Sequence, residues 1–224
     1  MEIKQYTDQI KPFHEEAARE AKLRWSHVAH PLHSLGLLED AIVKIAGITG
    51  SAKIDFKKKT VFILCADNGI VEEGVTQTDS SVTASVVRGF TKGEGCVTLM
   101  AKKAGADCIP VDLGIADAIE NCGEAYPLVR EKIAFGTKNF IKEPAMTMEQ
   151  MMKAIDVGVE LVKKEKEKGT GMIAVGEMGI GNTTTSSALA AVFLNKDVRQ
   201  VTGKGAGLSI EGLERKIQVI ETAI

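Results

Sequence analysis

The stretch from Gly171 to Ser187, GMIAVGEMGIGNTTTSS, constrains the fold of this chain more than any other segment. It begins with an apolar run of strand type, continues with glycines at positions 176, 179 and 181, and passes through small hydroxyl residues into an apolar helix. Glycine allows positive φ and close approach of the backbone to a ligand, while the first N–H groups of a helix and its dipole favour an anion. The stretch therefore predicts a strand, a glycine turn and a helix N-terminus that binds a phosphate.

Within this stretch, Gly176 and Gly181 have the spacing of a Walker A motif, but Asn182 follows them where that motif has lysine, and Thr183 comes next. Because that lysine reaches the outer phosphates of a triphosphate, its absence favours a ligand with one phosphate. Glu177 is unusual here, since a carboxylate repels a phosphate unless it points elsewhere, for example at a ribose or a developing cation. Glycine-rich loops have low specificity, so a structural β-α turn without a ligand is the alternative interpretation.

The rest of the chain alternates between strand and helix patterns. The continuous apolar run 60–66 suits a parallel strand covered on both faces, and 107–115 predicts a second strand, which Pro110 weakens or places near an edge. Residues 116–132 are expected to be irregular. Helical patterns cover 82–90, 96–104, 148–168 with a solvated charged end, 186–194 and 210–224. This alternation predicts an α/β fold with a parallel sheet of doubly wound type, flanked by helices.

The polar residues Asp67, Asn68 and Gly69 follow the first predicted strand directly. In open α/β sheets, ligands bind at the carboxyl ends of the strands, so these residues are candidates for a binding site. Asp, Asn and Gly are also the residues of an ordinary β-turn. The local sequence favours neither interpretation over the other.

The N-terminal part of the chain has helical patterns of its own. Residues 3–29 have the spacing of one or two amphipathic helices, and 37–47 predicts another, with Ser34 as its N-cap and Gly47 closing it. The histidines at positions 14, 27, 30 and 33 also lie here, but Pro31 breaks any helix that would align the last three. No acidic or cysteine ligand completes a set nearby, so a metal site is not predicted.

Composition excludes several classes of function. The net charge of −2 and the pI near 6.1 give no electrostatic reason to expect nucleic acid or an anionic membrane as a partner. The cysteines at positions 65, 96, 108 and 122 lack CxxC spacing, which argues against a zinc site or a disulfide framework. The N-terminus is charged and no apolar run has the length of a membrane span, so we expect a cytoplasmic protein.

Taken together, the motifs of this chain resemble those of the nicotinate-nucleotide:dimethylbenzimidazole phosphoribosyltransferase family. The matches follow one another in order over nearly the whole chain, which makes the resemblance specific. The matching segments are 34–36 with 38–39, 65–69, 73–75, 82–84, 111–114, 136–139 with 144–146, 176–184, and 203–208 followed by Arg215 and Lys216.

The resemblance implies a fold and a reaction. It implies a Rossmann-like nucleotide-binding domain over residues 51–224, a small helical domain to which residues 1–50 contribute, and a homodimer that uses no metal or other cofactor. The implied substrates are nicotinate mononucleotide and a benzimidazole-type base. A nitrogen of the base attacks C1′, nicotinate leaves, and inversion gives the α-ribazole 5′-phosphate of the lower loop of a cobamide. This chemistry needs a cradle for one phosphate, an environment that tolerates cationic character at C1′, and a base for the azole proton.

The resemblance also implies roles for single residues. Glu177 takes the catalytic position and faces the ribose and the azole, while the glycine-loop amides around Gly179, with Gly205 and Lys216, hold the phosphate. The loop 73–85 lines the base pocket. The residues expected to bind substrate are Asp67, Asn68, Thr78, Asn139, Gly176, Gly179, Gly181, Asn182, Thr183, Gly203, Gly205 and Lys216.

The chain also departs from the family pattern. Asn68 stands where the family commonly has histidine, and His33 and Leu37 replace a glycine and an arginine. The resemblance covers about the first two thirds of the family's length, and the usual general-base glutamate lies beyond it, so we expect a truncated chain. A noncatalytic nucleotide-binding fragment or partner subunit is therefore an alternative to the enzyme. A P-loop nucleotide hydrolase is disfavoured because Asn182 replaces the lysine.

Overall fold

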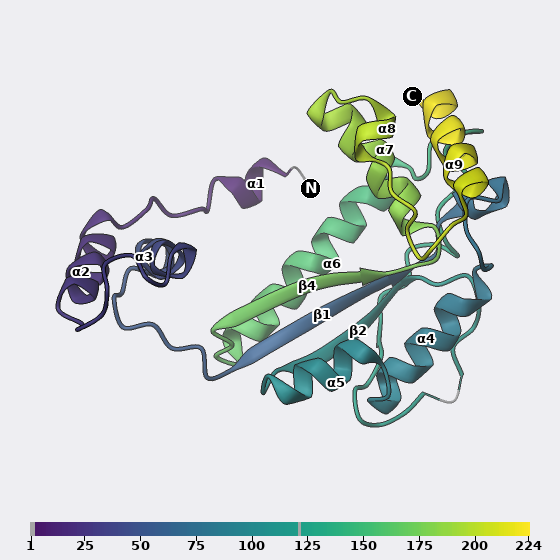
Figure 1. The fold of residues 1–224 in the computed structure, drawn as a ribbon. Helices are drawn as coiled ribbons and strands as arrows, with labels where there is room; N and C mark the ends of the chain where they lie inside the picture. The colour runs from purple at the N-terminus through teal and green to yellow at the C-terminus, as the bar shows by residue number, and fades with distance from the viewer. Residues whose placement is uncertain (1–2, 121) are drawn as a thin grey trace. The chain divides into compact units, whose positions relative to one another are not determined.

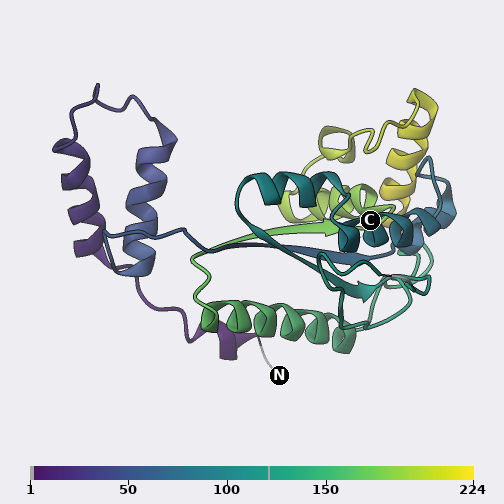
Figure 2. The ribbon, with the colours of Figure 1, turned by 90° about the horizontal axis from the view of Figure 1, so that it is seen from below.

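The computed structural model describes residues 3–120 and 122–224 (Figure 1). The chain forms two compact units, one ending at Lys57 and the other running from Lys58 to Ile224. The first unit contains the helices α1 (Lys4–Thr7), α2 (Glu15–Ser26) and α3 (Leu37–Thr49). Helices α2 and α3 pack against each other (Figure 2), and α2 buries three alanines of one face, Ala17, Ala18 and Ala21.

Helix α3 begins after a glycine and ends at another. Its N-cap is Gly36, so the predicted Ser34 cap is wrong; the Ser34 amide instead donates to Pro31 O in the preceding turn. The helix also continues past Gly47 and ends at Gly50, whose φ of 72° is the left-handed conformation that glycine adopts easily. Gly47 has a packing role, because a Cβ atom there would lie 2.0 Å from the ring of Phe13.

The second unit is built on a four-stranded parallel sheet with the order β3-β2-β1-β4. Helices separate β1 from β2 and β3 from β4 in the chain and lie on both faces of the sheet, so the predicted α/β fold with a parallel, helix-flanked sheet is confirmed (Figure 1). In chain order the elements are β1 (Lys59–Ala66), the 3-10 helix η1 (Gly69–Glu73), α4 (Ser81–Lys92), α5 (Cys96–Lys103), β2 (Asp107–Gly114), β3 (Val129–Arg130), α6 (Met148–Glu167), β4 (Met172–Met178), α7 (Asn182–Leu194), α8 (Val198–Val201) and α9 (Ile210–Ala223).

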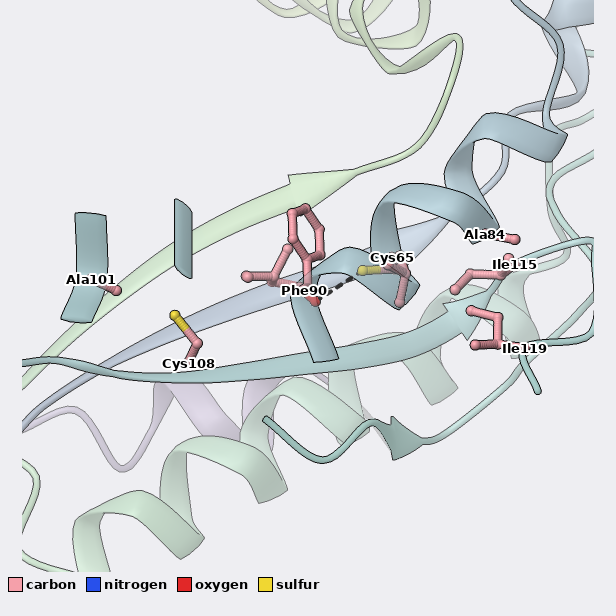
Figure 3. Packing of buried hydrophobic residues seen from close by; sticks show 9 residues of the cluster. Cys65, Ala84, Phe90, Ala101, Cys108, Ile115 and Ile119 are labelled. Atoms are coloured by element: carbon pink, nitrogen blue, oxygen red, sulfur yellow. Dashed lines mark hydrogen bonds between the residues drawn. The ribbon is translucent and has the colours of Figure 1, made fainter. Parts of the chain in front are cut away.

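Strand β1 contributes to the cores on both faces of the sheet. Ile63 and Cys65 pack against α4 and α5, while Phe62 packs against α6 on the opposite face (Figure 2). The prediction of a doubly covered strand is therefore correct. Figure 3 shows Cys65 and Cys108 among the apolar side chains of the first core. Burial raises the pKa of Cys65 to about 12, which makes it an inert, buried small side chain.

Strand β2 explains how the sheet accommodates Pro110. This proline lies opposite Ile63 of β1, but β2 pairs with β3 only from Val111 to Asp112. On its other side Pro110 therefore faces the edge of the sheet, where a missing N–H breaks no ladder hydrogen bond. The sequence pattern missed β3, because two paired residues are too few to produce a periodicity.

Helix α6 joins the sheet through a buried carboxylate near its C-terminus. Glu165 is 3% exposed, and its carboxylate accepts hydrogen bonds from Thr60 Oγ1 at 2.7 Å and Thr170 Oγ1 at 2.8 Å, with Lys168 Nζ at 2.8 Å. The solvated end predicted for this helix is therefore wrong at Glu165. Burial opposes the charge, but these donors lower the pKa of Glu165 to about 2.

Two absences hold for residues 3–120 and 122–224. No helix there is long and apolar enough to cross a membrane. No group of three or more His, Cys, Asp or Glu side chains is arranged to hold a metal ion.

Candidate active site

The glycine loop after β4 packs directly on the carboxyl end of β1. A Cβ atom at Gly179 would lie 1.8 Å from Ala66 O, so only glycine fits there. Gly181 has φ of 91° and is the N-cap of α7, which begins at Asn182 and not near residue 186 as predicted. The run of Thr and Ser residues therefore forms the first turns of a helix. The two glycines give the loop its shape through contacts within the chain.

The peptide of Ile180, at the centre of this loop, is held by two side chains from other elements. Its N–H donates to Thr83 Oγ1 at 3.0 Å, and its carbonyl accepts from Asn68 Nδ2 at 3.2 Å. Asn68 Oδ1 in turn accepts from Thr185 Oγ1 at 2.9 Å. Asn68 therefore uses its amide group within the chain, and it does not line the neighbouring cavity.

Two backbone amides at the start of α7 remain available to a ligand. Within the described part of the chain, no hydrogen-bond acceptor is found for the N–H of Gly181 or of Thr183. The amides of Asn182 and Thr184 are paired with Gly179 O and Gly181 O. The open donors lie at the positive end of the helix dipole, as an anion site requires.

Lys216 of α9 connects this loop to a second glycine loop. Its ammonium donates to Thr183 Oγ1 at 2.8 Å and to Gly203 O at 3.0 Å. Gly205 packs against the same groups, because a Cβ atom there would lie 2.7 Å from Thr183 Oγ1. The structure thus brings together two glycine segments that are distant in the sequence.

The environment of Lys216 is unusual for a lysine. Lys216 is 1% exposed, and no carboxylate of residues 3–120 or 122–224 forms an ion pair with it. Burial lowers its pKa, because a low-dielectric environment disfavours the ammonium form. A buried cation without a counter-ion is costly, and an anionic ligand nearby would offset that cost.

A cavity of about 260 Å³ lies between the two glycine loops and the loop that precedes α4. The polar group of Gln77 joins two of its walls, since Nε2 donates to Gly207 O at 2.5 Å. Six of the predicted binding residues line the cavity, namely Thr78, Gly179, Gly181, Asn182, Thr183 and Gly205. The sequence analysis missed Gln77, Lys204 and Ala206 as individual lining residues, although they adjoin predicted segments.

Glu177 does not line this cavity, but it contacts a residue that does. Its Oε1 accepts a hydrogen bond from Asn182 Nδ2. Desolvation by the surrounding protein raises the pKa of Glu177, and the bond from Asn182 offsets part of that rise. Together with Gly176, Glu177 lines an apolar cavity of about 530 Å³ that also includes Phe90 and Met178.

Two further predicted binding residues have their polar groups engaged away from the cavity. Asp67 is 3% exposed; its Oδ2 accepts from the Ala116 amide at 2.8 Å, and its Oδ1 is buried without a hydrogen-bond partner in the described chain. Burial raises the pKa of Asp67, although the hydrogen bond from the Ala116 amide offsets part of the rise. Asn139 donates to Glu73 Oε1. Neither Asp67 nor Asn139 lines the cavity.

Comparison with known proteins identifies the family of the chain. A family model described as a phosphoribosyltransferase matches residues 10–224. The chain belongs to this phosphoribosyltransferase family. Among the curated relatives, the nicotinate-nucleotide–dimethylbenzimidazole phosphoribosyltransferase of Ruminiclostridium cellulolyticum is 43% identical over 224 residues, which is 100% of this chain and 62% of the relative. The enzyme of the same name from Acetivibrio thermocellus is 44% identical over 201 residues, 90% of this chain and 56% of the relative.

A solved member of the phosphoribosyltransferase family has the same fold. The crystal structure of CobT from Thermus thermophilus superposes with a TM-score of 0.85 at 32% identity, covering 92% of this chain and 61% of that one. The resemblance inferred from the motifs is thereby confirmed. The chain spans about three fifths of the length of these relatives.

Proposed function

We propose that this chain is part of an enzyme that transfers 5-phosphoribosyl from nicotinate mononucleotide to 5,6-dimethylbenzimidazole or a related base. The observation that carries the proposal is Lys216, a buried ammonium without a carboxylate partner beside the cavity between the two glycine loops. A single phosphate fits this arrangement, because Gly181 and Thr183, whose amides are open, line the cavity together with Lys204, and Lys216 contacts Thr183 from behind the lining. Asn182 stands where a Walker A motif has the lysine that binds the outer phosphates.

In the proposed reaction, the residues around the phosphate and the residue near C1′ of the ribose have different roles. The phosphate binds the amides of Gly181 and Thr183, and Lys216 stabilises it through its charge and its bond to the Thr183 hydroxyl. Glu177, held by Asn182, stabilises the positive charge that develops at C1′ as the bond to nicotinate breaks. The attacking nitrogen forms the new bond from the opposite face, and the azole proton leaves to a base.

The proposal extends to assembly and location. Residues 51–224 serve as the nucleotide-binding domain, residues 1–50 contribute to a small helical domain, and the enzyme acts as a cytoplasmic homodimer on small-molecule substrates, without nucleic acid or membrane. What supports these statements is the family of the chain and its near-neutral charge.

The test is a product assay. The 224-residue chain is incubated with nicotinate mononucleotide and dimethylbenzimidazole, and mass spectrometry measures α-ribazole phosphate and free nicotinate. Equal amounts of both above a no-protein control support the transferase. Nucleotide binding without product favours the noncatalytic alternative. The absence of both nucleotide binding and product would contradict the proposal.

A further inference from the structure

The orientation of the Gly181 amide is determined by residues outside the glycine loop. The Ile180 carbonyl and the Gly181 N–H belong to one peptide plane, and no cis peptide bond occurs in the described residues. In a trans peptide the two groups point in opposite directions. The hydrogen bond from Asn68 Nδ2 to Ile180 O therefore directs the Gly181 N–H away from Asn68.

A second side chain determines the preceding peptide plane in the same way. Thr83, which is 0% exposed, accepts from the Ile180 N–H, so the Gly179 carbonyl points to the other side, where it accepts from the Asn182 amide at 3.1 Å. Thr83 lies on α4, whereas Asn68 follows β1. Two independent elements thus fix consecutive peptides of the loop.

Thr185 fixes the orientation of the Asn68 amide group. Its hydroxyl donates to Asn68 Oδ1, which leaves Nδ2 as the group that faces Ile180 O. Close packing adds to this constraint, because a Cβ atom at Gly181 would lie 3.1 Å from the Asn68 Cβ. The loop therefore has little room to adopt another shape.

We propose that Asn68, Thr83 and Thr185 are positioning residues that hold the peptides of Ile180 and thereby orient the Gly181 amide for a phosphate. The inference rests on the proposed phosphate site. It assigns Asn68 a role through the loop and without contact to the substrate. It also makes a chemical demand on position 68, which must present a donor to Ile180 O and an acceptor to Thr185.

The experiment compares variants that differ by single atoms or groups. Asn68→Asp keeps the size of the side chain but removes the donor to Ile180, and Thr83→Val removes the acceptor. Thr83→Ser retains the hydroxyl and is the conservative rescue. Ser186→Ala, at an exposed position next to Thr185, is the matched control. Calorimetry gives the affinity for nicotinate mononucleotide and for nicotinate riboside, which lacks the phosphate, and NMR follows the exchange of the Ile180 amide, which is bonded to Thr83.

Asn68→Asp and Thr83→Val are expected to weaken binding of the mononucleotide about tenfold, to leave riboside binding unchanged, and to speed exchange of the Ile180 amide. Thr83→Ser and Ser186→Ala should behave as the wild type. Equal losses of affinity for the two ligands would overturn the inference, and so would unchanged amide exchange in Asn68→Asp and Thr83→Val. If the wild type binds neither ligand, the proposed function fails, while the exchange rates still decide whether these residues position the loop.

Discussion

At the scale of single residues, Lys216 distinguishes a binding site from a structural turn. Glycine loops at strand ends are common, and the shape of this one follows from Gly179 and Gly181 packing within the chain. The buried charge of Lys216 is not explained by contacts within the chain, because its only two hydrogen bonds in the described structure are to a hydroxyl and a carbonyl, neither of which carries a negative charge. From the sequence alone, Lys216 is simply a helical lysine, and its role could be expected only through the family resemblance, since burial depends on the packing of α9.

Replacing Lys216 by methionine should weaken binding of nicotinate mononucleotide about tenfold or more, because a charge-assisted contact is lost. Lys196→Met, which removes an exposed charge, is the control and should change little. The affinity of the wild type should also fall as pH rises through the lowered pKa of Lys216, since only the ammonium attracts the phosphate. Calorimetry over a pH series checks this, and unaltered affinity in Lys216→Met would remove the phosphate assignment.

Glu177→Gln should lower kcat about a hundredfold while leaving nucleotide affinity nearly unchanged, because the carboxylate charge acts on the transition state. Glutamine keeps the acceptor for Asn182, so the geometry is retained. In the wild type, kcat should rise with pH through the raised pKa of Glu177, as the anion forms. A steady-state pH profile measures both effects, and a kcat equal to that of the wild type would argue against the role.

At the scale of elements, the strands and long helices could be predicted from periodicity, whereas their ends could not. The threonines and serines after Gly181 are typical of a loop or cap, and the pattern placed the start of α7 near residue 186. A left-handed glycine cap permits the earlier start at Asn182. Glu165 failed as a solvated residue because it has a tertiary partner, Thr60, that no local pattern contains. Ser34 failed as a cap because it belongs to the turn before the helix, where its amide donates to Pro31 O, and Gly36 is the N-cap.

The close approach of the glycine loop to β1 makes a quantitative prediction. Gly179→Ala should destabilise the protein by about 3 kcal/mol, because its Cβ would overlap the backbone at Ala66 O. Gly176→Ala is the matched control, since the nearest atom to its Cβ would be Phe62 O at 3.9 Å, an ordinary contact. Urea unfolding of both variants gives the comparison. Similar free energies of unfolding for the two would contradict the packing described here.

The anchor between α6 and the sheet should appear as pH-dependent stability. Because the pKa of Glu165 is about 2 in the folded protein against 4.5 for the free side chain, its contribution is full above pH 4.5 and is lost as pH falls toward 2. Glu165→Gln should lower the free energy of unfolding by about 2 kcal/mol at pH 7 and should remove most of its decrease below pH 4.5. The exposed Glu167→Gln is the control. Urea unfolding between pH 3 and pH 7 measures the free energy of unfolding of the wild type and both variants. If this free energy depended on pH in the same way in all three proteins, the role of Glu165 as an anchor would be refuted.

At the scale of the whole molecule, the candidate site is assembled from segments spread over the second compact unit. Asn68, Thr83, Gly181, Gly205 and Lys216 come from five different segments, and they meet because parallel strands bring their carboxyl ends to one edge of the sheet. The sequence could predict the two glycine loops and that edge. It could not predict the contact between the loops, which depends on one lysine reaching from α9 to Thr183.

The most direct test of the central claim, a single-phosphate site between the two glycine loops, is calorimetric titration of the protein with nicotinate mononucleotide and with nicotinate riboside. We expect the mononucleotide to bind about a hundredfold more tightly, because only it brings an anion to the Gly181 and Thr183 amides and to Lys216. Inorganic phosphate should compete with it. Equal affinities for the two ligands would show that the cavity does not bind phosphate and would contradict the account.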